Sequence, residues 1–515
     1  MSRTKPEIHW LPRRTGAFHV PPGAAPSAVV VGGGIAGIAA ATVLAERGVR
    51  VTLLEKEAEL GGRAGGFAEQ LPTGERVQME RGFHGFFRQY YTLRALLSRI
   101  DPKLSMLTEL ADYPVLGPGG EVQSFSGLPK RTPLQVMALT MRTPHLKARD
   151  LAQVNGLAAL EMLAFDAERT YARFDHISAS DYLASLAMPE RARRMLFDVF
   201  AHSFFNPEAQ MSAAELLMMF HFYFTGNPEG LIFDVVNEPL GTALWRPMAS
   251  YLAARGVRIE TAAAVTRIEH TGQKIGVEHA HGTVTADMLV LALDVGGLQA
   301  VITDSPSLQA LWPNVSAMRA THPFGVLRLW LDRPVRPDRV PFAGTTGIGM
   351  LDNISVYERF QGESARWSRD HGGSVVELHA YAVPPEASAD EVRADLIAGL
   401  HAFYPETRAA RIVHERFLMR GDCPAFPPGG HARRPQVATV LPNVVLAGDG
   451  IAAPVPCALM ERAAITGFLA ANTLLAPLGV MPEPIRSVPS QGLLAPPSFL
   501  RGKQPRSLEL DEAAQ

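Results

Sequence analysis

Residues 27–66 read SAVVVGGGIAGIAAATVLAERGVRVTLLEKEAELGGRAGG, and this stretch decides the fold. Its valine-rich start, Ser27–Val31, predicts one short buried parallel strand. Gly32–Gly37 follows and fits the pattern G-x-G-x-x-G. In this pattern the first glycine allows a tight turn, the second lets a pyrophosphate approach the backbone, and the third brings the next helix close. A helix from about Ala36 to Arg47 then directs its N-terminal N–H groups at that phosphate.

A second predicted strand and an acidic residue make the glycine motif specific. Gly48 ends the helix, Val49–Leu54 forms the strand, and Glu55 follows Gly37 by 18 positions. An acid at about this distance accepts hydrogen bonds from the ribose hydroxyls of an adenosine. The alternative, a glycine-rich turn in a domain that binds no nucleotide, does not account for the acid. The sequence therefore predicts a dinucleotide-binding unit.

A second glycine cluster and a segment near the C-terminus point to the same ligand. Gly61–Gly66 contains Arg63, and glycines beside an arginine suit a backbone that passes close to a charged cofactor. Taken alone, this cluster is equally compatible with an ordinary surface loop. Asp449 follows a predicted strand at 444–447 and precedes a predicted helix from about 458 to 475. Because ligands bind at the carboxyl ends of parallel strands, we expect Asp449 beside the same cofactor.

The composition narrows the classes of function. The chain has 515 residues, 47% of them hydrophobic and 19% charged, which suffices for a large core with two or three interleaved substructures. Its formal charge is −2, without the basic excess that a nucleic-acid partner requires. Cys423 and Cys457 are its only cysteines, too few for a disulfide framework or a four-thiolate metal centre. We expect no metal and a reducing compartment.

The apolar segments are too short to cross a membrane. Leu216–Phe224 has nine residues, whereas a spanning helix needs about 20. Such a run predicts a buried helix, with a wall of a long apolar tunnel or a contact with lipid as alternatives. Arg13-Arg14 resembles an export signal, but the apolar segment behind it is the strand before Gly32. We expect a cytoplasmic protein, either soluble or peripheral at the inner face of the cell membrane.

The middle of the chain predicts helices and then a second sheet. Leu151–Arg173 and Asp181–Phe205 have helical apolar spacing. Val284–Leu293 predicts one buried strand, and strands are predicted again over 330–350 and 374–384. The fold class is therefore α/β, with a Rossmann-like cofactor domain interleaved with a mixed sheet-plus-helix substrate domain. The predicted segments are an extended arm (1–26), three cofactor-domain parts (27–100, 241–300, 431–475), a helical substrate domain (101–240), its sheet and helix (301–430), and a disordered tail (476–515).

The segment MERGFHGFFRQYY, residues 79–91, carries the candidate catalytic residues. Glu80 and His84 are candidate bases, and the ring of Tyr90, like those of Phe83 and Phe86, has a face that stabilises a cation. The alternative is a core segment whose charges pair with one another. Two further histidines, at positions 202 and 221, lie in apolar helical patterns and are predicted to be core residues.

The order of these motifs resembles the FAD-dependent amine oxidase and phytoene desaturase superfamily. The matching pieces also include AAVTRIE (263–269), ADMLVLAL (286–293), LAGD (446–449) and ALMERAAITG (458–467). The resemblance implies FAD, with pyrophosphate on the glycine motif, ribose on Glu55, adenine at the Val265 backbone and flavin O2 facing the Met460 N–H. The residues implied in binding FAD are Gly32, Gly34, Ile35, Ala36, Gly37, Glu55, Lys56, Gly62, Arg63, Gly82, Val265, Gly448, Asp449 and Met460.

A narrower resemblance is to the bacterial carotenoid ring desaturase/methylases of the isorenieratene synthase group. It rests on residues 79–102, ARRMLFDVFAHSFFNPE (192–208), SAAELLMMFHFYFTGNPEGL (212–231) and PVPCALMERAA (454–464). It implies conversion of the β-ionone ring of a carotene into an aromatic ring, with migration of one methyl group. The implied partners are a hydrophobic carotenoid and an electron acceptor, quinone or oxygen. Some relatives carry an appended iron–sulfur domain, which two cysteines do not support.

Two other functions stay open. A desaturase or oxidase of the same superfamily acts on a linear carotene or an amine, although a cationic amine favours carboxylates and residues 92–241 offer Phe, Met and Leu. In some amine oxidases a cysteine shortly before Pro-Pro-Gly holds the flavin covalently. Cys423 precedes Pro427-Pro428-Gly429 with a different spacing, so we predict no attachment. A carrier that shields a prenyl chain without FAD conflicts with the intact glycine motif.

Overall fold

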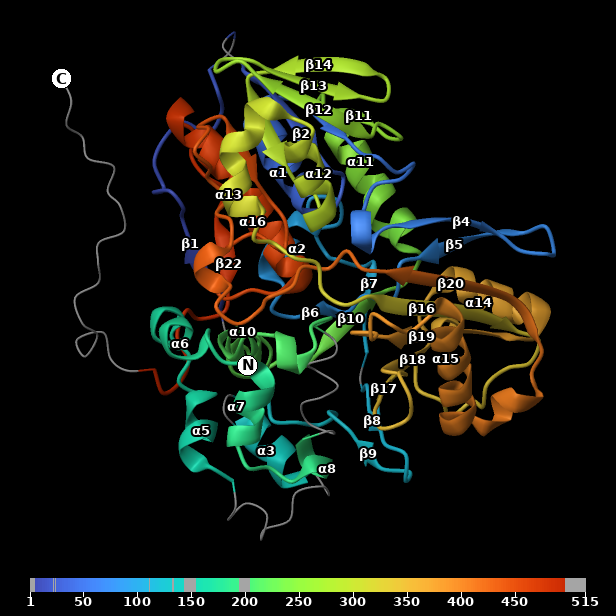
Figure 1. Ribbon diagram of the computed structural model, residues 1–515. Coiled ribbons are helices and arrows are strands. Elements are labelled where there is room, and N and C mark those ends of the chain that lie inside the picture. The colour runs from blue at the N-terminus through green and yellow to red at the C-terminus, as the bar shows by residue number, and fades with distance from the viewer. Residues whose placement is uncertain are drawn as a thin grey trace.

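The computed structural model describes residues 5–21, 23, 25–110, 112–131, 134–142, 154–193 and 204–495 (Figure 1). The upper part in that view is built on a five-stranded parallel sheet with the order β11-β3-β2-β15-β21. Its strands span Arg258–Glu260, Arg50–Leu54, Ser27–Val31, Met288–Leu291 and Val444–Leu446. The predicted first strand is confirmed, and its carboxyl end brings the glycine motif to the middle of the sheet edge.

Helices surround this sheet, and two of them cross closely. They are α1 (Ile35–Glu46), α11 (Arg246–Ala253), α12 (Val295–Thr303), α13 (Trp312–Val315) and α16 (Leu459–Leu475). A Cβ on Gly467 of α16 would lie only 2.3 Å from the Ala36 carbonyl oxygen of α1. Small residues therefore let these two helices, from opposite ends of the sequence, meet beside the glycine motif.

An antiparallel three-stranded sheet adjoins the parallel one and corrects one sequence prediction. It consists of β12 (Val265–His270), β13 (Ile275–His279) and β14 (Gly282–Ala286). The predicted single strand over 284–293 is wrong, because β14 ends at Ala286 and β15 begins at Met288 in the other sheet. Between them, the Asp287 carboxylate accepts hydrogen bonds from Ser27 N–H at 2.9 Å and from Lys274 at 2.5 Å. These two hydrogen bonds hold Asp287 at the point where the chain passes from the antiparallel sheet to the parallel one.

A seven-stranded mixed sheet forms the second large unit, on the right in Figure 1. Its order is β20-β16-β19-β18-β17-β8-β9, and β17 with β8 is its parallel pair. The strands span Ile412–Arg420, Phe324–Leu331, Ser374–Ala380, Asn353–Val356, Phe342–Thr345, Val115–Leu116 and Val122–Gln123. Helices α14 (Gly362–His371) and α15 (Ala389–Phe403) accompany it. The predicted second sheet is confirmed.

Smaller pieces connect the two units. One is the hairpin of β4 (Gly66–Gln70) and β5 (Arg76–Glu80). Another is a three-stranded sheet of β6 (Phe86–Phe87), β10 (Phe233–Val236) and β7 (Leu107–Glu109). Helix α2 (Tyr91–Leu97) follows β6 and packs on α16. Residues 79–97 thus run from one unit to the other.

The helical region is broken into shorter helices than the sequence predicts. They are α3 (Leu134–Arg142), α5 (Gly156–Glu161), α6 (Ala167–Phe174), α7 (Ala179–Ser185), α8 (Glu190–Arg193) and α10 (Ala213–Phe220). A side-chain cap at Asp166 starts a new helix inside the pattern predicted over 151–173, and the cap at Ser178 starts α7 two residues before the pattern predicted from Asp181. Parts of those patterns, and the histidine at 202, lie outside the described residues.

The apolar run at 216–224 is buried, as predicted. It ends α10 and continues into a π-helical turn over His221–Thr225. His221 is a satisfied core histidine, with contacts to Thr225 Oγ1 at 3.0 Å and to the Pro489 carbonyl at 2.7 Å. Within the described part of the chain, no helix combines the length and the apolar character that a membrane span requires.

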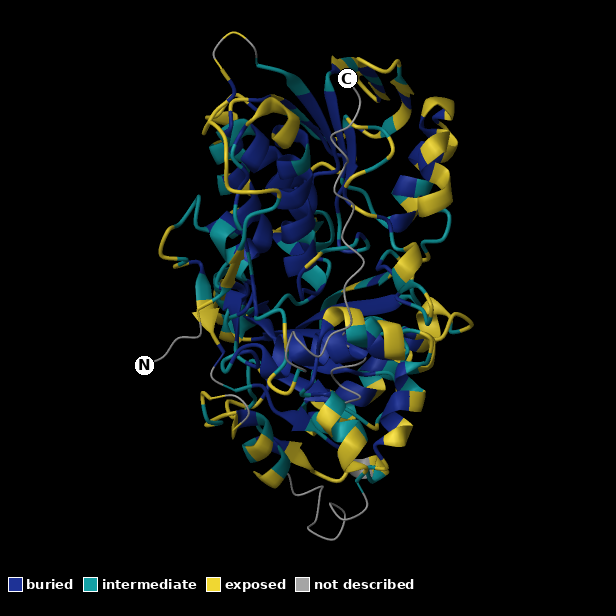
Figure 2. Cartoon of the chain, turned by 90° about the vertical axis from the view of Figure 1, so that its left-hand side faces the viewer, coloured by how far each residue is buried: buried dark blue, intermediate teal, exposed yellow. Residues whose placement is uncertain are grey.

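The two ends of the described chain meet. β1 (Glu7–His9) pairs with β22 (Ile485–Ser487), and Asn472 of α16 binds the backbone on both sides of this contact. The predicted disordered tail is therefore wrong for residues 476–495, where Ile485 and Val488 are buried. The prolines in this segment interrupt the regular spacing of apolar residues, so the periodicity of the sequence did not indicate that Ile485 and Val488 are buried. Figure 2 shows buried residues running through both units, with exposed ones on the outer helices and loops.

Candidate active site

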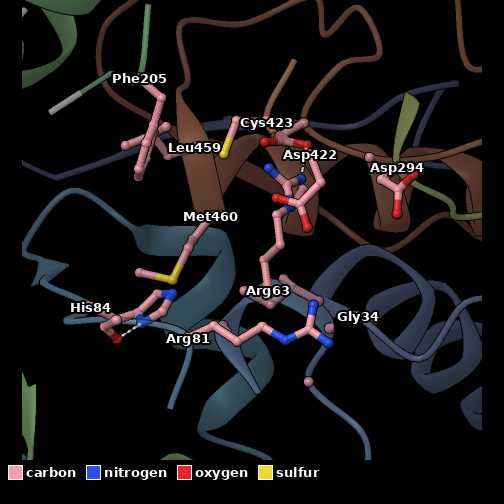
Figure 3. Close-up of a pocket in the computed structure, with 18 of the residues that line it drawn as sticks. Gly34, Arg63, Arg81, His84, Phe205, Asp294, Asp422, Cys423, Leu459 and Met460 are labelled. Atoms are coloured by element: carbon pink, nitrogen blue, oxygen red, sulfur yellow. Dashed lines mark hydrogen bonds and ion pairs between the residues drawn. The ribbon is translucent and has the colours of Figure 1, made fainter. Parts of the chain in front are cut away.

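One cavity of about 440 Å³ lies between the parallel sheet and the seven-stranded sheet. We call its two parts the glycine end and the aromatic end. The glycine end is lined by the β2–α1 turn, Glu55, Gly62, Arg63 and Asp449, and the aromatic end by Phe83, Phe87, Tyr90, Tyr223, Phe233 and Phe342. Figure 3 shows the meeting point of the two parts, with His84 and Met460 both pointing into the cavity.

The β2–α1 turn leaves no space for side chains except where the cavity begins. Gly32 has φ +106°, and a Cβ there would lie 2.3 Å from the Ala292 carbonyl oxygen. A Cβ on Gly37 would lie 1.8 Å from the Gly32 carbonyl oxygen. At Gly34, by contrast, the nearest atom is 3.8 Å away, the Cα of Gly62. The backbone of Gly34 is therefore open to a ligand at the start of α1, as a phosphate site requires.

Glu55 closes the far side of the glycine end. Its Oε2 accepts the Gly33 N–H at 2.6 Å and its Oε1 accepts the Glu57 N–H at 2.8 Å. Each carboxylate oxygen keeps a further lone pair, so two hydroxyl groups still find acceptors. Val265 and Lys56 line the cavity nearby. This donor and acceptor set fits an adenosine ribose.

Arg63 and Asp449 join the two ends of the sequence across the cavity. The Arg63 guanidinium donates to Asp449 Oδ1, and Figure 3 shows this side chain reaching toward Asp422 and Cys423. Gly448, with φ +143°, turns the chain before Asp449. Burial raises the pKa of the Cys423 thiol to about 11, so the thiol stays protonated. Among the described residues, no group of His, Cys, Asp and Glu side chains forms a metal site.

The start of α16 lies at the cavity. Its N-cap residue, Ala458, offers no side-chain hydrogen bond, and Leu459 has the unusual φ of +49°. The first N–H groups of a helix lack partners within the helix and carry the positive end of its dipole. Leu459 and Met460 line the cavity. This helix start therefore favours a partial negative charge on a bound group.

The aromatic end is a continuous wall of rings. The Phe83 ring centroid lies 4.4 Å from that of Phe342 and 5.8 Å from that of Phe233. Phe87 lines the cavity and Phe86 does not, because neighbouring strand residues point to opposite sides and Phe86 is fully buried in the core. The sequence prediction that Phe86 faces a substrate is thus wrong, and Phe87 takes that position in the cavity wall.

The candidate catalytic residues lie at different places. His84 lines the cavity, its Nδ1 contacts the Gly82 carbonyl at 2.7 Å, and burial lowers its pKa to about 4. The ring is therefore neutral, with Nδ1 donating and Nε2 unprotonated. The Tyr90 hydroxyl lies 2.7 Å from that of Tyr223, and both rings line the cavity.

Glu80 does not line the cavity. Its Oε1 accepts the Leu240 N–H at 2.8 Å and its Oε2 binds Arg328 at 3.0 Å. Burial raises the pKa of this carboxyl, against the opposing effect of the Arg328 charge. Of the other sequence-predicted residues, Gly37 lies beneath the turn. Those that line the cavity are Gly32, Gly34, Ile35, Ala36, Glu55, Lys56, Gly62, Arg63, Gly82, Val265, Gly448, Asp449 and Met460.

Sequence reasoning missed a polar strip in the aromatic end. His379 and Tyr381 line the cavity together with Asn353, the first residue of the neighbouring strand β18, and Asp352 just before it. The alternation of His379 and Tyr381, two positions apart in a predicted strand, places both on one face and was the available signal. Arg81, which binds Glu57 Oε1 at 3.2 Å, also lines the cavity.

Comparisons with known proteins agree with this geometry. A family model described as flavin containing amine oxidoreductase matches residues 35–475. A carotenoid phi-ring synthase of Streptomyces griseus is 48% identical over 473 residues, 91% of this chain and 92% of that protein. A carotenoid phi-ring synthase of Chlorobaculum tepidum is 28% identical over 590 positions, 91% of each chain. The solved structure of a putrescine oxidase triple mutant superposes with a TM-score of 0.65 and 16% identity, over 88% of this chain and 99% of that one, which shows the fold.

Proposed function

The chain belongs to the flavin containing amine oxidoreductase family, and we propose that it uses FAD to convert the β-ionone ring of a carotene into an aromatic ring with migration of one methyl group. The observation that carries this proposal is one continuous cavity in which the glycine end, with the open Gly34 backbone and the Glu55 carboxylate, meets an aromatic end. Support for the reaction comes from the two phi-ring synthases, which match over nine-tenths of the chain.

In this proposal the glycine end holds FAD. The pyrophosphate lies against Gly34 at the start of α1, the ribose on Glu55, and the adenine at the Val265 backbone. Arg63, which is paired with Asp449, lies along the phosphate and the flavin. The α16 start faces flavin O2 through the Met460 N–H, where a helix dipole stabilises negative charge on the ring. Segments 27–100, 241–300 and 431–475 supply the cofactor part of the cavity. Segments 101–240 and 301–430 supply the substrate part, together with Phe83, Phe87 and Tyr90 of the first segment.

The aromatic end favours a carotene over an amine. Its wall consists of Phe and Tyr rings, which bind an apolar ring by burial of surface. One carboxylate, Asp352, lies at this end, and its Oδ2 accepts the Tyr381 N–H at 2.6 Å. A linear carotene and an amine remain the alternative substrates.

The reaction needs oxidation, a methyl shift and proton loss. A bound flavin supplies a two-electron acceptor for hydride. The protein residues exclude water, hold the ring, and stabilise the cation whose neighbouring carbon gives up a methyl group. We assign the faces of Phe83, Phe87 and Tyr90 to the cation. His84 is the candidate base at the glycine side, since its Nε2 has a free lone pair. Glu80 then acts only as a counter-charge for Arg328.

We further propose that the protein contacts the inner face of the cell membrane, where the carotene resides, and passes electrons to a quinone or to oxygen. Support for the contact comes from α3 and α5, which expose large apolar side chains at their surface. These are Leu134, Met137, Met141, Leu157 and Leu160, with Met141 81% and Leu157 79% exposed. Flotation with liposomes tests this surface, because Met137→Glu and Met141→Glu together then shift the protein to the unbound fraction.

Co-expression in a host that accumulates β-carotene tests the reaction. We expect a pigment with fewer hydrogens, unchanged carbon number and an aromatic end group in its mass spectrum. Unchanged β-carotene, with folded and flavin-loaded protein in the same cells, contradicts the proposal. Linear carotenes are then the next substrates to test, followed by amines.

A further inference from the structure

Three polar side chains lie in a row along β19. Glu377 and His379 belong to the strand and Tyr381 follows it directly. Because alternate residues of an extended chain point to the same side, all three share one face. His379 and Tyr381 line the aromatic end of the cavity, whereas Glu377 is fully buried behind them. The row therefore leads from the cavity into the protein.

The three side chains form one hydrogen-bonded chain. The Tyr381 hydroxyl lies 2.6 Å from His379 Nδ1, and His379 Nε2 lies 2.8 Å from Glu377 Oε1. A carboxylate only accepts, so Nε2 carries the hydrogen and Nδ1 accepts the tyrosine proton. With a hydrogen on Nε2 the Phe83 N–H, 3.2 Å away, does not donate to that nitrogen, and the shorter contact to the Glu377 carboxylate decides the tautomer.

The surroundings of Glu377 keep its carboxylate ionised. Burial would raise the pKa of this carboxyl, but Arg328 and the hydrogen bond from His379 hold it at about 2. Arg328 Nε donates to Glu377 Oε2 at 2.8 Å, and the Tyr357 hydroxyl donates to Oε1 at 2.9 Å. Glu80 is the second carboxylate on Arg328. A fixed negative charge therefore stabilises a positive charge on His379.

Tyr381 lines the cavity, and its hydroxyl group has two hydrogen-bond partners. It donates to His379 and accepts the Asn353 side-chain amide at 3.0 Å, which leaves one lone pair. Its ring packs against Phe205, with the ring centroids 4.9 Å apart. Gly82 lets the histidine come close, because a Cβ there would lie 3.1 Å from His379 Cε1. The arrangement resembles the nucleophile–base–carboxylate order of hydrolase triads, with a phenol in the first place.

We propose that Tyr381, His379 and Glu377 form a proton relay that removes a proton from the carotene ring after the methyl shift. The proposal rests on the proposed function, in which each oxidation removes one hydride, with its electron pair, from the ring. In the relay step a ring C–H bond breaks and its electron pair becomes the new ring C=C bond. The proton joins the Tyr381 oxygen, while the proton of the tyrosine hydroxyl passes to His379 Nδ1.

The charges of this step balance within the site. The ring cation becomes neutral and His379 becomes an imidazolium, next to the ionised Glu377. Tyr381 is a neutral phenol before and after the step. When the product leaves, the proton returns along the same path to water. Two oxidations of one ring release two protons, and Tyr381 with His84 gives the cavity two proton acceptors.

The test compares purified wild-type protein with Tyr381→Phe and His379→Gln, using β-carotene in liposomes. We expect both substitutions to lower the rate of aromatic product about 100-fold, within the range of general acid–base catalysis. Flavin absorbance per protein, melting temperature and KM are expected to stay near those of wild type. A trapped cation also adds water and loses a proton, which gives a pigment one oxygen heavier than the substrate. A merely structural role does not produce that pigment.

Tyr404→Phe is the matched control. Its hydroxyl is buried in the same unit, lies outside the cavity, and has no hydrogen-bond partner among the described residues. A fall of less than tenfold in both relay variants overturns the relay, provided that wild type makes the aromatic product. If the wild-type protein makes no aromatic product, the proposed function is wrong, and the relay that rests on it is wrong with it. Should one variant fold poorly, the other decides.

Discussion

The two ends of the cavity are built in different ways. The glycine end consists largely of backbone from short stretches of consecutive residues, such as the β2–α1 turn and Gly61–Arg63. The aromatic end consists of side chains from separate elements, with Phe83 before β6, Phe233 on β10 and Phe342 on β17. A backbone site leaves little freedom for substitution, whereas a wall of side chains tolerates exchange of one apolar group for another.

This difference predicts opposite responses to mutation. At the glycine end, one added methyl group either collides with backbone or fills the ligand space. At the aromatic end, loss of one ring leaves the other rings in place, so the shape and the charge distribution of the wall change only in part. Substitutions at the glycine end should therefore lower the amount of bound cofactor. Substitutions at the aromatic end should lower product formation while the amount of bound cofactor stays constant.

The largest effect is expected for Gly34→Val. The backbone of Gly34 is extended, with φ −77° and ψ −177°, which valine adopts readily, and the nearest atom to a Cβ is 3.8 Å away. The fold should therefore persist while the side chain occupies the phosphate position. We expect flavin affinity to fall roughly 1,000-fold, about 4 kcal/mol. Flavin absorbance per protein after gel filtration measures this, with circular dichroism to follow the fold.

Gly156→Ala is the control for that substitution, because a Cβ there has no neighbour within 4 Å and lies far from the cavity. It should keep full flavin content. A Gly34→Val protein that retains flavin would show that the phosphate does not pass this glycine, and the comparison between the two ends would lose its basis.

The second prediction concerns pH and the buried charge at the aromatic end. The folded-state pKa of Glu377 is about 2, below the unfolded value of about 4.5. Its contribution, about 3 kcal/mol, is therefore present above pH 4.5 and is lost as the pH falls toward 2. We expect Glu377→Gln to lower the melting temperature at pH 6 and to flatten its fall between pH 4.5 and 3. Equal slopes for both proteins in that range contradict the assignment.

These contrasts also explain what the sequence could predict. The β2–α1 turn and Glu55 could be predicted because a local motif with fixed spacing builds them, and Asp449 because it follows a predicted parallel strand whose carboxyl end lies at the same edge of the sheet. The strand pattern could have placed His379 and Tyr381 on one face, but it could not predict their hydrogen-bonded network, because that network depends on Arg328 and Asn353, which only the folded sheet brings near. Phe86 and Phe87 differ by one strand position, and no pattern in two residues tells which faces the cavity. The tail at 476–495 was missed because its order comes from pairing with β1.

The third prediction separates the nucleotide from the flavin ring. Glu55→Gln removes the charge that accepts the ribose hydroxyls and places an amide against the Gly33 or Glu57 N–H. We expect FAD to bind about 10- to 100-fold more weakly, about 1.4–2.8 kcal/mol, whereas FMN affinity stays unchanged because FMN lacks the adenosine. Titration of the apoprotein with each flavin, followed by fluorescence, measures both constants. An equal loss for FAD and FMN would mean that Glu55 supports the turn and not the ribose.

The smallest effect is expected for Phe83→Leu, which exchanges a ring for an apolar side chain of similar reach. Cation–π stabilisation at one ring contributes about 1 kcal/mol, so the rate of aromatic product should fall about fivefold at unchanged flavin content. Phe360→Leu is the matched control, because Phe360 lies 5.9 Å from Phe83 between ring centroids but does not line the cavity. It removes the same packing contact and should leave the rate within twofold of wild type. Equal rate losses for both variants would assign the effect to packing, whereas a loss confined to Phe83→Leu places the cation at the aromatic end.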